Sequence, residues 1–395
     1  MVYFCEMNKT HNEHAFINGK LLQLVINSFQ KHAIHCHMST SHWGELSDII
    51  NNDSKVNFSA ITVLEPKAKR KIKWVIKIVV ECFNVIRVIR RAFKNEVSLV
   101  FFSSMSPFAN YFTHFWARLP RYRHIKIIVT LHGELQLLRS KNVKLVDRIY
   151  AICVRKALRA KFPNRKFLVL NELIKGKLIE DKLIDPSSIL EIPHPYDDKY
   201  KHAVFSKHQV QEMAFGHIGT AKLAKNSHLF FDLAKQNAES VLSGKAIFLI
   251  SGQVFPDVNP FHNGFVEYIS SLTLIDAKKY MEQCLRMRYA VFLYIDDQYE
   301  MVSSGTIMDA IAFGIPLISI KNAYSEYLFG LCNTTPGILC ESYDDMANHV
   351  QRLILNGDAH YAQYLFGIQE LQAYFSFERI QDMFDSQMDF IGIRS

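Results

Sequence analysis

Residues 289–321 read YAVFLYIDDQYEMVSSGTIMDAIAFGIPLISIK, and this stretch decides the fold class. It opens with an apolar run of β-forming residues, 289–295, and it closes with a second such run. Between the two lies an apolar helix pattern that starts at Gly305, stops at Gly314 and cannot continue through Pro316. A strand, a loop, a helix and a strand joined by short connections form the repeating unit of a parallel α/β sheet.

Small polar residues precede the helix of this unit: Ser303, Ser304, Gly305 and Thr306. They place unpaired backbone N–H groups at a helix N-terminus, where the helix dipole is positive, and such an end favours an anion. Gly305 allows a bulky anion to approach the backbone closely. Asp309 lies one turn into the helix and faces the same side. An ordinary Ser/Thr helix cap explains these residues equally well.

The stretch SSGTIMDAIAFGIPLIS resembles the donor-site motif of GT-B glycosyltransferases, in particular the family 4-like, group 1 enzymes of bacterial polysaccharide synthesis. The resemblance implies that Asp309 binds the ribose or the donor sugar of a sugar nucleotide. Retaining members carry two glutamates spaced E-x7-E, and here the first position holds Met301, next to Glu300. By matching position, Ser304, Gly305 and Thr306 would bind the donor diphosphate, and Ser303, just before them, is a further candidate for donor binding.

Length and composition indicate a folded protein of two domains. The chain has 395 residues, 49% of them hydrophobic and 21% charged, which excludes a disordered protein. Its seven cysteines are scattered without metal-ligand spacing, so we expect reduced, mostly buried thiols in a reducing compartment. The net charge of +8 favours anionic partners: sugar nucleotides, a membrane surface or nucleic acid.

The sequence opens without a signal-peptide pattern, and we expect no transmembrane span. The predicted location is therefore the cytoplasm, with possible peripheral attachment to the inner face of the cell membrane. Since no Asp-x-Asp motif, no G-x-x-x-x-G-K-(S/T) loop and no G-x-G-x-x-G fingerprint stands out, we expect no bound metal ion and no cofactor other than the nucleotide-diphosphate sugar.

The first strand of the N-terminal half is predicted at 2–6, and a polar loop at 8–18 follows it. Gly19 then precedes a helix with apolar residues at helical spacing. GT-B enzymes open in the same way, and the resemblance makes Asn18 and Gly19 candidates for contact with the acceptor and the donor phosphates. A glycine that serves only as a turn residue is the alternative.

Residues 67–94 carry ten basic side chains and one acidic side chain, Glu81. Trp74, Val75, Ile78, Val79, Cys82, Phe83, Ile86 and Ile89 recur among them at helical spacing, which predicts an amphipathic basic helix. We expect the apolar stripe to pack on the sheet. The density of cations suggests binding to an anionic membrane that carries a lipid-linked acceptor.

A predicted strand at 125–131 ends in His132, Gly133 and Glu134. This VTLHGE stretch resembles the T-x-H segment that closes a strand in the N-terminal domain of many GT-B enzymes. The resemblance implies that His132 points toward the donor sugar or the acceptor. Histidine at the carboxyl end of a strand suits proton transfer or hydrogen bonds to sugar hydroxyls. Glu134 is either a general base or a neighbour of the next helix cap.

The segment IPHPYD at 192–197 resembles the linker that ends GT-B N-terminal domains, so we place a domain boundary at 197. The resemblance implies an α/β fold of two Rossmann-like domains, the GT-B architecture, facing a central cleft. Residues 1–197 would bind the acceptor and residues 198–375 the sugar nucleotide. A C-terminal helix in 376–395 would tie the two domains together.

A predicted strand at 214–218 opens the second domain and ends in Gly219. The family pattern continues with a basic residue, a variable loop and a lysine that pairs with the donor diphosphate. By matching position that lysine is Lys225, and Lys222 is a second candidate. The family's usual arginine is Thr220 here. Gly252, at the end of the next strand, would face the same site.

Together these features predict a metal-independent glycosyltransferase that moves a sugar from a nucleotide-diphosphate donor to a glycan or lipid-linked acceptor. The predicted catalytic residues are His132, Glu134, Lys225 and Asp309. A sugar-nucleotide epimerase of the same architecture is one alternative, and it would act without an acceptor. A non-catalytic protein that binds membrane or nucleic acid through its basic helix is another, although the helix lacks the interleaved aromatic platform expected for nucleic acid.

Overall fold

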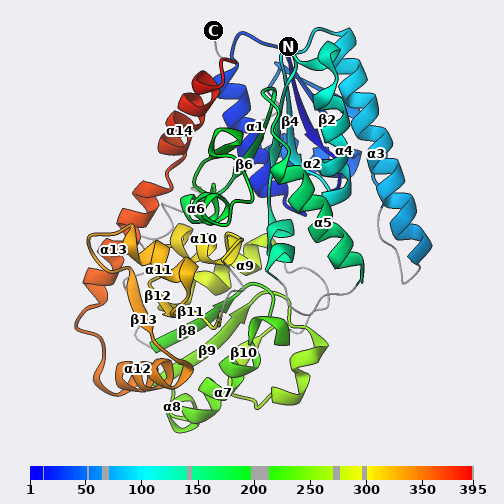
Figure 1. Cartoon of the computed structure of the whole chain (residues 1–395). Coiled ribbons are helices and arrows are strands. Elements are labelled where there is room, and N and C mark those ends of the chain that lie inside the picture. Colours follow the sequence, from blue (N-terminus) through cyan, green and yellow to red (C-terminus); the bar gives the residue numbers. More distant parts are fainter. Residues whose placement is uncertain are drawn as a thin grey trace. The chain divides into compact units, whose positions relative to one another are not determined.

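The structure is a computed structural model that describes residues 1–11, 13–50, 53–64, 71–139, 145–196, 213–269, 276–295 and 300–393, with backbone only at 71–74 and 277. The chain divides into two compact units (Figure 1). Unit 1 comprises Met1–Pro195, Met301–Ser303 and Phe377–Ser395, and unit 2 comprises Tyr196–Glu300 and Ser304–Ser376. The boundary predicted at 197 falls outside the described residues.

Unit 1 contains a parallel sheet with the strand order β3-β2-β1-β4-β5-β6-β7. Its strands are β1 (Val2–Glu6), β2 (Ile34–Met38), β3 (Val56–Ala60), β4 (Leu99–Ser104), β5 (Lys126–Thr130), β6 (Arg165–Val169) and β7 (Ile189–Glu191). Phe4 of β1 lies opposite Cys36 of β2 and Phe101 of β4. The strand order reverses between β1 and β4, and ligands of open α/β sheets bind at such a switch point, beyond the carboxyl ends of the strands.

Helices cover both faces of this sheet because successive strand residues point to opposite sides. Phe4 belongs to a core cluster with α1 (Ala15–Ser28), α2 (Thr40–Ile49) and α14 (Phe377–Phe390). Tyr3 belongs to the cluster of the other face, with α3 (Lys71–Lys94), α4 (Pro107–Arg118), α5 (Leu145–Arg159) and α6 (Glu172–Glu180). The C-terminal helix α14 thus packs into the core of unit 1; its predicted role in tying the domains together stays a prediction.

Unit 2 repeats the design with the strand order β10-β9-β8-β11-β12-β13 and parallel pairing. Its strands are β8 (Met213–Ile218), β9 (Ala246–Ser251), β10 (Val266–Tyr268), β11 (Tyr289–Phe292), β12 (Leu317–Ile320) and β13 (Gly337–Cys340). Its helices are α7 (His228–Gln236), α8 (Ala238–Leu242), α9 (Ala277–Leu285), α10 (Gly305–Ala312), α11 (Ala323–Gly330), α12 (Tyr343–Asn356) and α13 (Tyr361–Tyr374). Here the switch point lies between β8 and β11.

The predicted α/β class is confirmed, and the opening unit folds as expected: β11, α10 and β12 follow one another, and Gly314 ends α10 with a φ of +66°. The prediction that Gly19 precedes the first helix is wrong. Asn18 and Gly19 lie inside α1 and are not part of a loop. A Cβ atom at residue 19 would lie 2.8 Å from Ile49, so the contact between α1 and α2 requires a small residue there.

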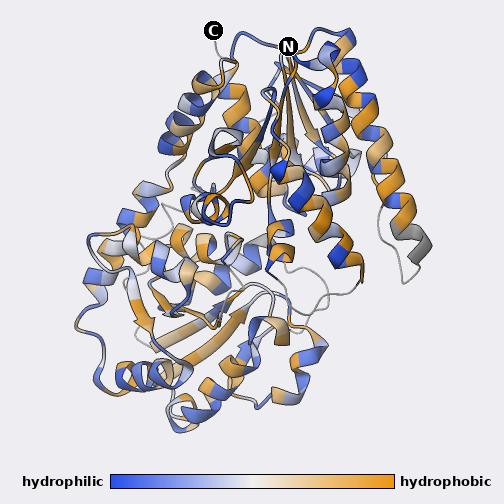
Figure 2. Cartoon of the chain, viewed as in Figure 1, coloured by the Kyte–Doolittle hydropathy of each residue, from blue (hydrophilic) through white to orange (hydrophobic). Residues whose placement is uncertain are grey.

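The prediction that the whole apolar stripe of α3 packs on the sheet is also wrong. Ile78 and Ile89 are buried in the core as expected, but Val75, Val79 and Phe83 are 51%, 45% and 65% exposed. The apolar residues of α3 therefore occupy two faces, one packed and one open (Figure 2). The side chain of Trp74 and residues 67–70 lie outside what is described. None of the described helices is long and apolar enough to cross a membrane.

Candidate functional site

The start of α10 has the features of an anion-binding helix N-terminus. Ser304 caps the helix, and its Oγ accepts a hydrogen bond from the N–H of Ile307 at 3.4 Å. The N–H groups of Gly305 and Thr306 meet no acceptor among the described residues. Gly305 is exposed, with open space where a Cβ atom would stand. Free amides at the positive end of a helix are an anion site.

Two glycines bring the ends of β8 and β9 against this helix start. A Cβ atom at Gly219 would lie 2.3 Å from Cγ2 of Thr306, and one at Gly252 would lie 2.0 Å from the carbonyl oxygen of Gly219. Their φ angles of +88° and +151° also favour glycine. Both residues are therefore required by the close packing of the backbone, which puts the carboxyl ends of two strands beside the N-terminus of α10.

Thr306 contacts Gly219 through Cγ2, and its hydroxyl group lies near two other hydroxyl groups. Its Oγ1 lies 2.9 Å from the hydroxyl of Tyr294, which follows β11, and 3.1 Å from Oγ of Ser304. Ser303 lies apart from this group. It belongs to unit 1, where its Oγ accepts a hydrogen bond from Nδ2 of Asn171 at 2.7 Å. Of the four predicted donor-binding residues in this stretch, the structure thus groups Ser304, Gly305 and Thr306, and the Ser303 hydroxyl is hydrogen-bonded within unit 1.

Lys225 supplies a cation in the loop that follows β8. It ends the short 3-10 helix Leu223–Lys225, is half-buried, and forms no ion pair with any described residue. Burial, together with the charge of Lys222, lowers the pKa of its ammonium to about 8. An anionic ligand would restore the stability of the charged form. A half-buried lysine that has no acidic partner in the described part of the chain is therefore suited to a phosphate.

His217 and Ser227 order this loop, and sequence reasoning did not single them out. Nε2 of the buried His217 lies 3.0 Å from Oγ of Ser227, and the same Oγ accepts a hydrogen bond from the N–H of Lys222 at 3.0 Å. Burial and the nearby Lys225 lower the pKa of His217 to about 3, so the ring is neutral. A histidine within a predicted strand is typical of an ordinary core residue, so the sequence did not indicate that His217 orders this loop.

Asp309 is engaged by a tyrosine of a neighbouring helix. The hydroxyl of Tyr280 in α9 donates a hydrogen bond to Oδ2 of Asp309 at 2.6 Å. Burial and this carboxylate raise the pKa of Tyr280 well above its usual range, so the phenol keeps its proton. Any sugar hydroxyl bound by Asp309 would share a carboxylate that Tyr280 holds in place. Nothing in the sequence connects the two residues.

Unit 1 contains a cavity of about 470 Å³ at its own switch point. Residues that follow β1, β4 and β5 line it, together with residues of α3 and α5. The polar side chains of the lining include Asn8, Lys9, His14, Lys77, Glu81, Ser104, Ser106, His132, Glu134 and Tyr150. The volume lies in the range of small-molecule sites. The structure therefore brings the predicted residues His132 and Glu134 into one cavity.

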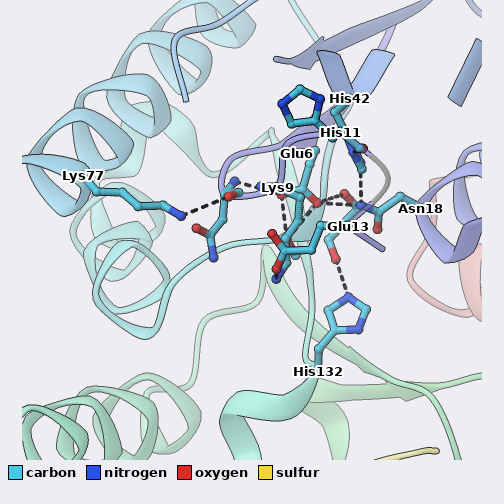
Figure 3. A network of polar contacts seen from close by, with 11 residues as sticks. Glu6, Lys9, His11, Glu13, Asn18, His42, Lys77 and His132 are labelled. Atoms are coloured by element: carbon cyan, nitrogen blue, oxygen red, sulfur yellow. Dashed lines mark hydrogen bonds and ion pairs between the residues drawn. The ribbon is translucent and has the colours of Figure 1, made fainter. Parts of the chain in front are cut away.

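His132 is a neutral hydrogen-bonding group in this cavity. Its Nε2 donates a hydrogen bond to the carbonyl oxygen of Ser103 at 2.7 Å, so that nitrogen carries the proton (Figure 3). Burial and the neighbouring His14 lower its pKa to about 3. The His14 ring meets it edge-on, with 5.3 Å between ring centroids. Nε2 of His132 is thus unavailable as a general base.

Glu134 has the properties of a group that exchanges protons near neutral pH. Its Oε2 accepts a hydrogen bond from the N–H of His132 at 3.0 Å. Desolvation raises the pKa of its carboxyl to about 7, against the opposing effect of backbone hydrogen bonds and Lys9. A carboxyl with a pKa near the working pH is a suitable general acid or base.

Glu6, at the end of β1, is a different kind of carboxyl. It is fully buried and accepts hydrogen bonds from the side chains of Asn18, Ser103 and Ser104 at 2.7–2.9 Å (Figure 3). It also accepts from the N–H groups of Asn8 and Lys9 at 2.8 and 3.0 Å. Five donors satisfy this carboxylate, which fixes the loop between β1 and α1 beside the cavity.

No family model matches the sequence, and no curated protein matches it significantly. Solved structures do match over the whole chain. A complex of Anabaena HepE with UDP and glucose aligns with a TM-score of 0.67 at 12% identity, over 99% of this chain and 100% of HepE. Sucrose-phosphate synthase from Thermosynechococcus elongatus aligns with a TM-score of 0.68 at 12% identity, over 100% of both chains.

The lipopolysaccharide outer core galactosyltransferase WaaB also aligns, with a TM-score of 0.62 at 13% identity, over 98% of this chain and 99% of WaaB. Identities this low are evidence of a common fold alone. The chain therefore has the GT-B fold of these glycosyltransferases, as the resemblance implied.

Proposed function

We propose that this protein is a glycosyltransferase that takes a sugar from a nucleotide-diphosphate donor and joins it to a hydroxyl of a glycan or lipid-linked acceptor without a metal ion. The observation that carries the proposal is the open start of α10, packed against the glycines that follow β8 and β9. UDP and UDP-glucose are bound in similar HepE structures, so UDP is the first ligand to test and UDP-glucose the first donor.

In this proposal, unit 2 holds the donor. The amides of Gly305 and Thr306 and the ammonium of Lys225 bind the diphosphate and stabilise the charge that develops on it as the glycosidic bond to phosphate breaks. Asp309, held by Tyr280, takes a hydroxyl of the ribose or the donor sugar. Positive charge from a helix end and a lysine replaces the metal ion in this role.

Unit 1 holds the acceptor. The acceptor oxygen forms the new bond to the anomeric carbon of the donor sugar, and its proton passes to Glu134. His132 donates to the backbone through Nε2 and so fixes the geometry of the segment that carries Glu134. A sugar-nucleotide epimerase, the alternative with the same fold, would change the donor without any acceptor.

Thermal-shift measurements with UDP and UDP-glucose test the donor assignment. We expect UDP to raise the unfolding midpoint, since a ligand that binds only the native state stabilises it. Product analysis with and without an added glycan extract then separates the two activities. A UDP-sugar converted to its epimer in the absence of acceptor would contradict glycosyl transfer, and no shift with any nucleotide diphosphate would contradict the donor site.

We also propose that unit 1 binds an anionic membrane at its cytoplasmic face, in surface polysaccharide assembly. Among the described side chains of α3, the exposed side begins with Val75, Ile76, Val79 and Phe83 and ends with Arg87, Arg90, Phe93 and Lys94. The exposed side of α5 has a similar order, with apolar Leu145, Val146, Ile149 and Ile152, interrupted by Arg148, followed by Arg155, Lys156 and Arg159. Helix α4 contacts both. These residues form what we call the membrane surface.

Both the apolar and the basic residues of the membrane surface favour binding to an anionic membrane. Apolar side chains gain about 25 cal/mol for each Å² removed from water, and each lysine or arginine near an anionic leaflet contributes about 1 kcal/mol. Flotation with vesicles containing phosphatidylglycerol should recover the protein, and neutral vesicles should recover much less. Phe83→Ser should weaken recovery, whereas Phe366→Ser, at a residue equally open in unit 2, should not. Equal loss in both variants would contradict the assignment.

A further inference from the structure

Glu81 is a buried carboxyl that the proposed chemistry does not use. It lies in α3, one turn after Lys77, and is 3% exposed. Its Oε1 accepts a hydrogen bond from the N–H of Ser106, just before α4, at 2.6 Å. Its Oε2 is buried without a hydrogen-bond partner among the described residues.

Comparison with Glu6 shows how unusual this is. Both carboxyls lie at the switch point of unit 1, and all five donors that Glu6 needs are supplied by the protein. Ser106 is the residue that hydrogen-bonds Glu81, and its bonds offset only part of the desolvation, so burial raises the pKa of Glu81 to about 7. Buried polar groups are nearly always satisfied, and an exception calls for a missing partner.

The cavity is where a ligand could supply this partner. Glu81 lines the cavity together with His132 and Glu134. Lys77 lies on the same wall and donates a hydrogen bond to the carbonyl oxygen of Asn8 at 3.3 Å. Apolar groups complete the lining: Ile78, Met105, Pro107 and Leu137. A cavity with hydrogen-bonding carboxyls on polar walls and apolar patches between them matches a sugar ring, whose hydroxyls lie around a hydrocarbon face.

We propose that Glu81 binds a hydroxyl group of the acceptor sugar through Oε2 and so determines which acceptor unit 1 accepts. A hydroxyl can both donate and accept a hydrogen bond, so it pairs with this carboxyl whether or not the carboxyl is protonated. The assignment rests on the proposed function, and it adds a binding residue on α3 that no sequence pattern indicated.

The test is a ligand-observed NMR titration with the methyl glycosides of glucose, galactose and N-acetylglucosamine. We expect at least one glycoside to bind the full-length protein. Glu81→Leu removes a hydrogen bond to a buried carboxyl, so it should weaken glycoside binding about tenfold or more. Glu81→Gln should have an intermediate effect, because its amide keeps the bond to Ser106 but replaces the free oxygen by a donor. Glu96→Gln, at an exposed glutamate just after α3, should bind like the unaltered protein.

UDP binding and the unfolding midpoint, measured on every variant, separate the possible failures. Unchanged glycoside binding in both Glu81 variants would overturn the inference and leave water as the partner of Oε2. Binding of UDP without binding of any glycoside would overturn it as well, while the donor site would stand. If UDP also fails to bind, the proposed function itself is wrong. Because Glu81→Gln is nearly isosteric, it keeps the test valid should Glu81→Leu not fold.

Discussion

The two switch points of this molecule share a topology and differ in chemistry. In unit 2, the strand ends lie beside backbone amides and a lysine for which the described residues offer no acceptor and no acidic partner. In unit 1, the strand ends meet carboxyls whose pKa is raised to about 7, beside a histidine that is held neutral. The first arrangement favours an anion, and the second favours hydroxyls and protons. In the proposed function, one parallel α/β topology would provide both the donor site and the acceptor site of a glycosyl transfer.

The largest expected effect comes from the proton-accepting side. Glu134→Gln should lower the turnover of glycosyl transfer about 10²- to 10⁴-fold, since it removes a general base. UDP binding should stay unchanged, because the residue belongs to unit 1. In the unaltered protein the deprotonated carboxyl is the active form, so the rate should rise with pH up to about 7 and then level off. A variant with full turnover and the same pH profile would remove Glu134 from the mechanism.

On the anion-binding side, Lys225→Ala should weaken UDP binding roughly tenfold to a hundredfold, as expected for a lost hydrogen bond to a charged group. Calorimetric titration measures it, and Lys235→Ala, at an exposed lysine of α7, is the matched control. UDP binding by the unaltered protein should also weaken as pH rises through about 8, where Lys225 loses its proton. Equal affinities in both alanine variants would speak against a phosphate at Lys225.

The contact between β8 and α10 can be broken without touching any charge. Gly219→Ala should lower the free energy of unfolding by about 1–3 kcal/mol and weaken UDP binding, because the new Cβ atom meets Thr306. Gly244→Ala is the control that separates backbone strain from the steric clash with Thr306. The φ angle of Gly244 is also positive, at +73°, but a Cβ atom there would meet open space. Chemical denaturation of both variants measures the difference. Equal effects on stability and binding would mean that the backbone conformation alone matters.

The smallest expected effect concerns the helix cap. Ser304→Ala should cost about 1 kcal/mol of stability and weaken UDP binding only slightly. Ser342 caps α12 in the same manner, with its Oγ accepting a hydrogen bond from the N–H of Asp345 at 3.1 Å. Ser342→Ala should cost a similar amount of stability and leave UDP binding unchanged. If the two variants bind UDP equally well, the cap of α10 acts on the helix alone.

Local sequence patterns were enough for the α/β class and for the bounds of α10 and β12, because glycine and proline end the helix and apolar periodicity sets each element. Sequence patterns gave wrong predictions where tertiary contacts determine the position or burial of a residue. Gly19 reads as a loop residue, yet the close packing of α1 on Ile49 places it inside a helix. The apolar stripe of α3 reads as one buried face, but periodicity cannot say how much of a helix the core covers.

Partners contributed by distant elements were also beyond the sequence. Tyr280 reaches Asp309 from another helix, and His217 orders the loop of Lys225 from within a strand. Glu81 looked like the single exception in a basic helix, and only the fold shows that it lines a cavity. The candidate residues His132, Glu134 and Lys225 came from the resemblance to a family. Their burial and pKa shifts are properties of the folded chain.

A crystal structure of the protein with UDP-glucose tests the central claim most directly. The account predicts a diphosphate within hydrogen-bonding distance of the N–H groups of Gly305 and Thr306, with Nζ of Lys225 on its other side. A nucleotide whose phosphates lie away from the start of α10 would contradict it.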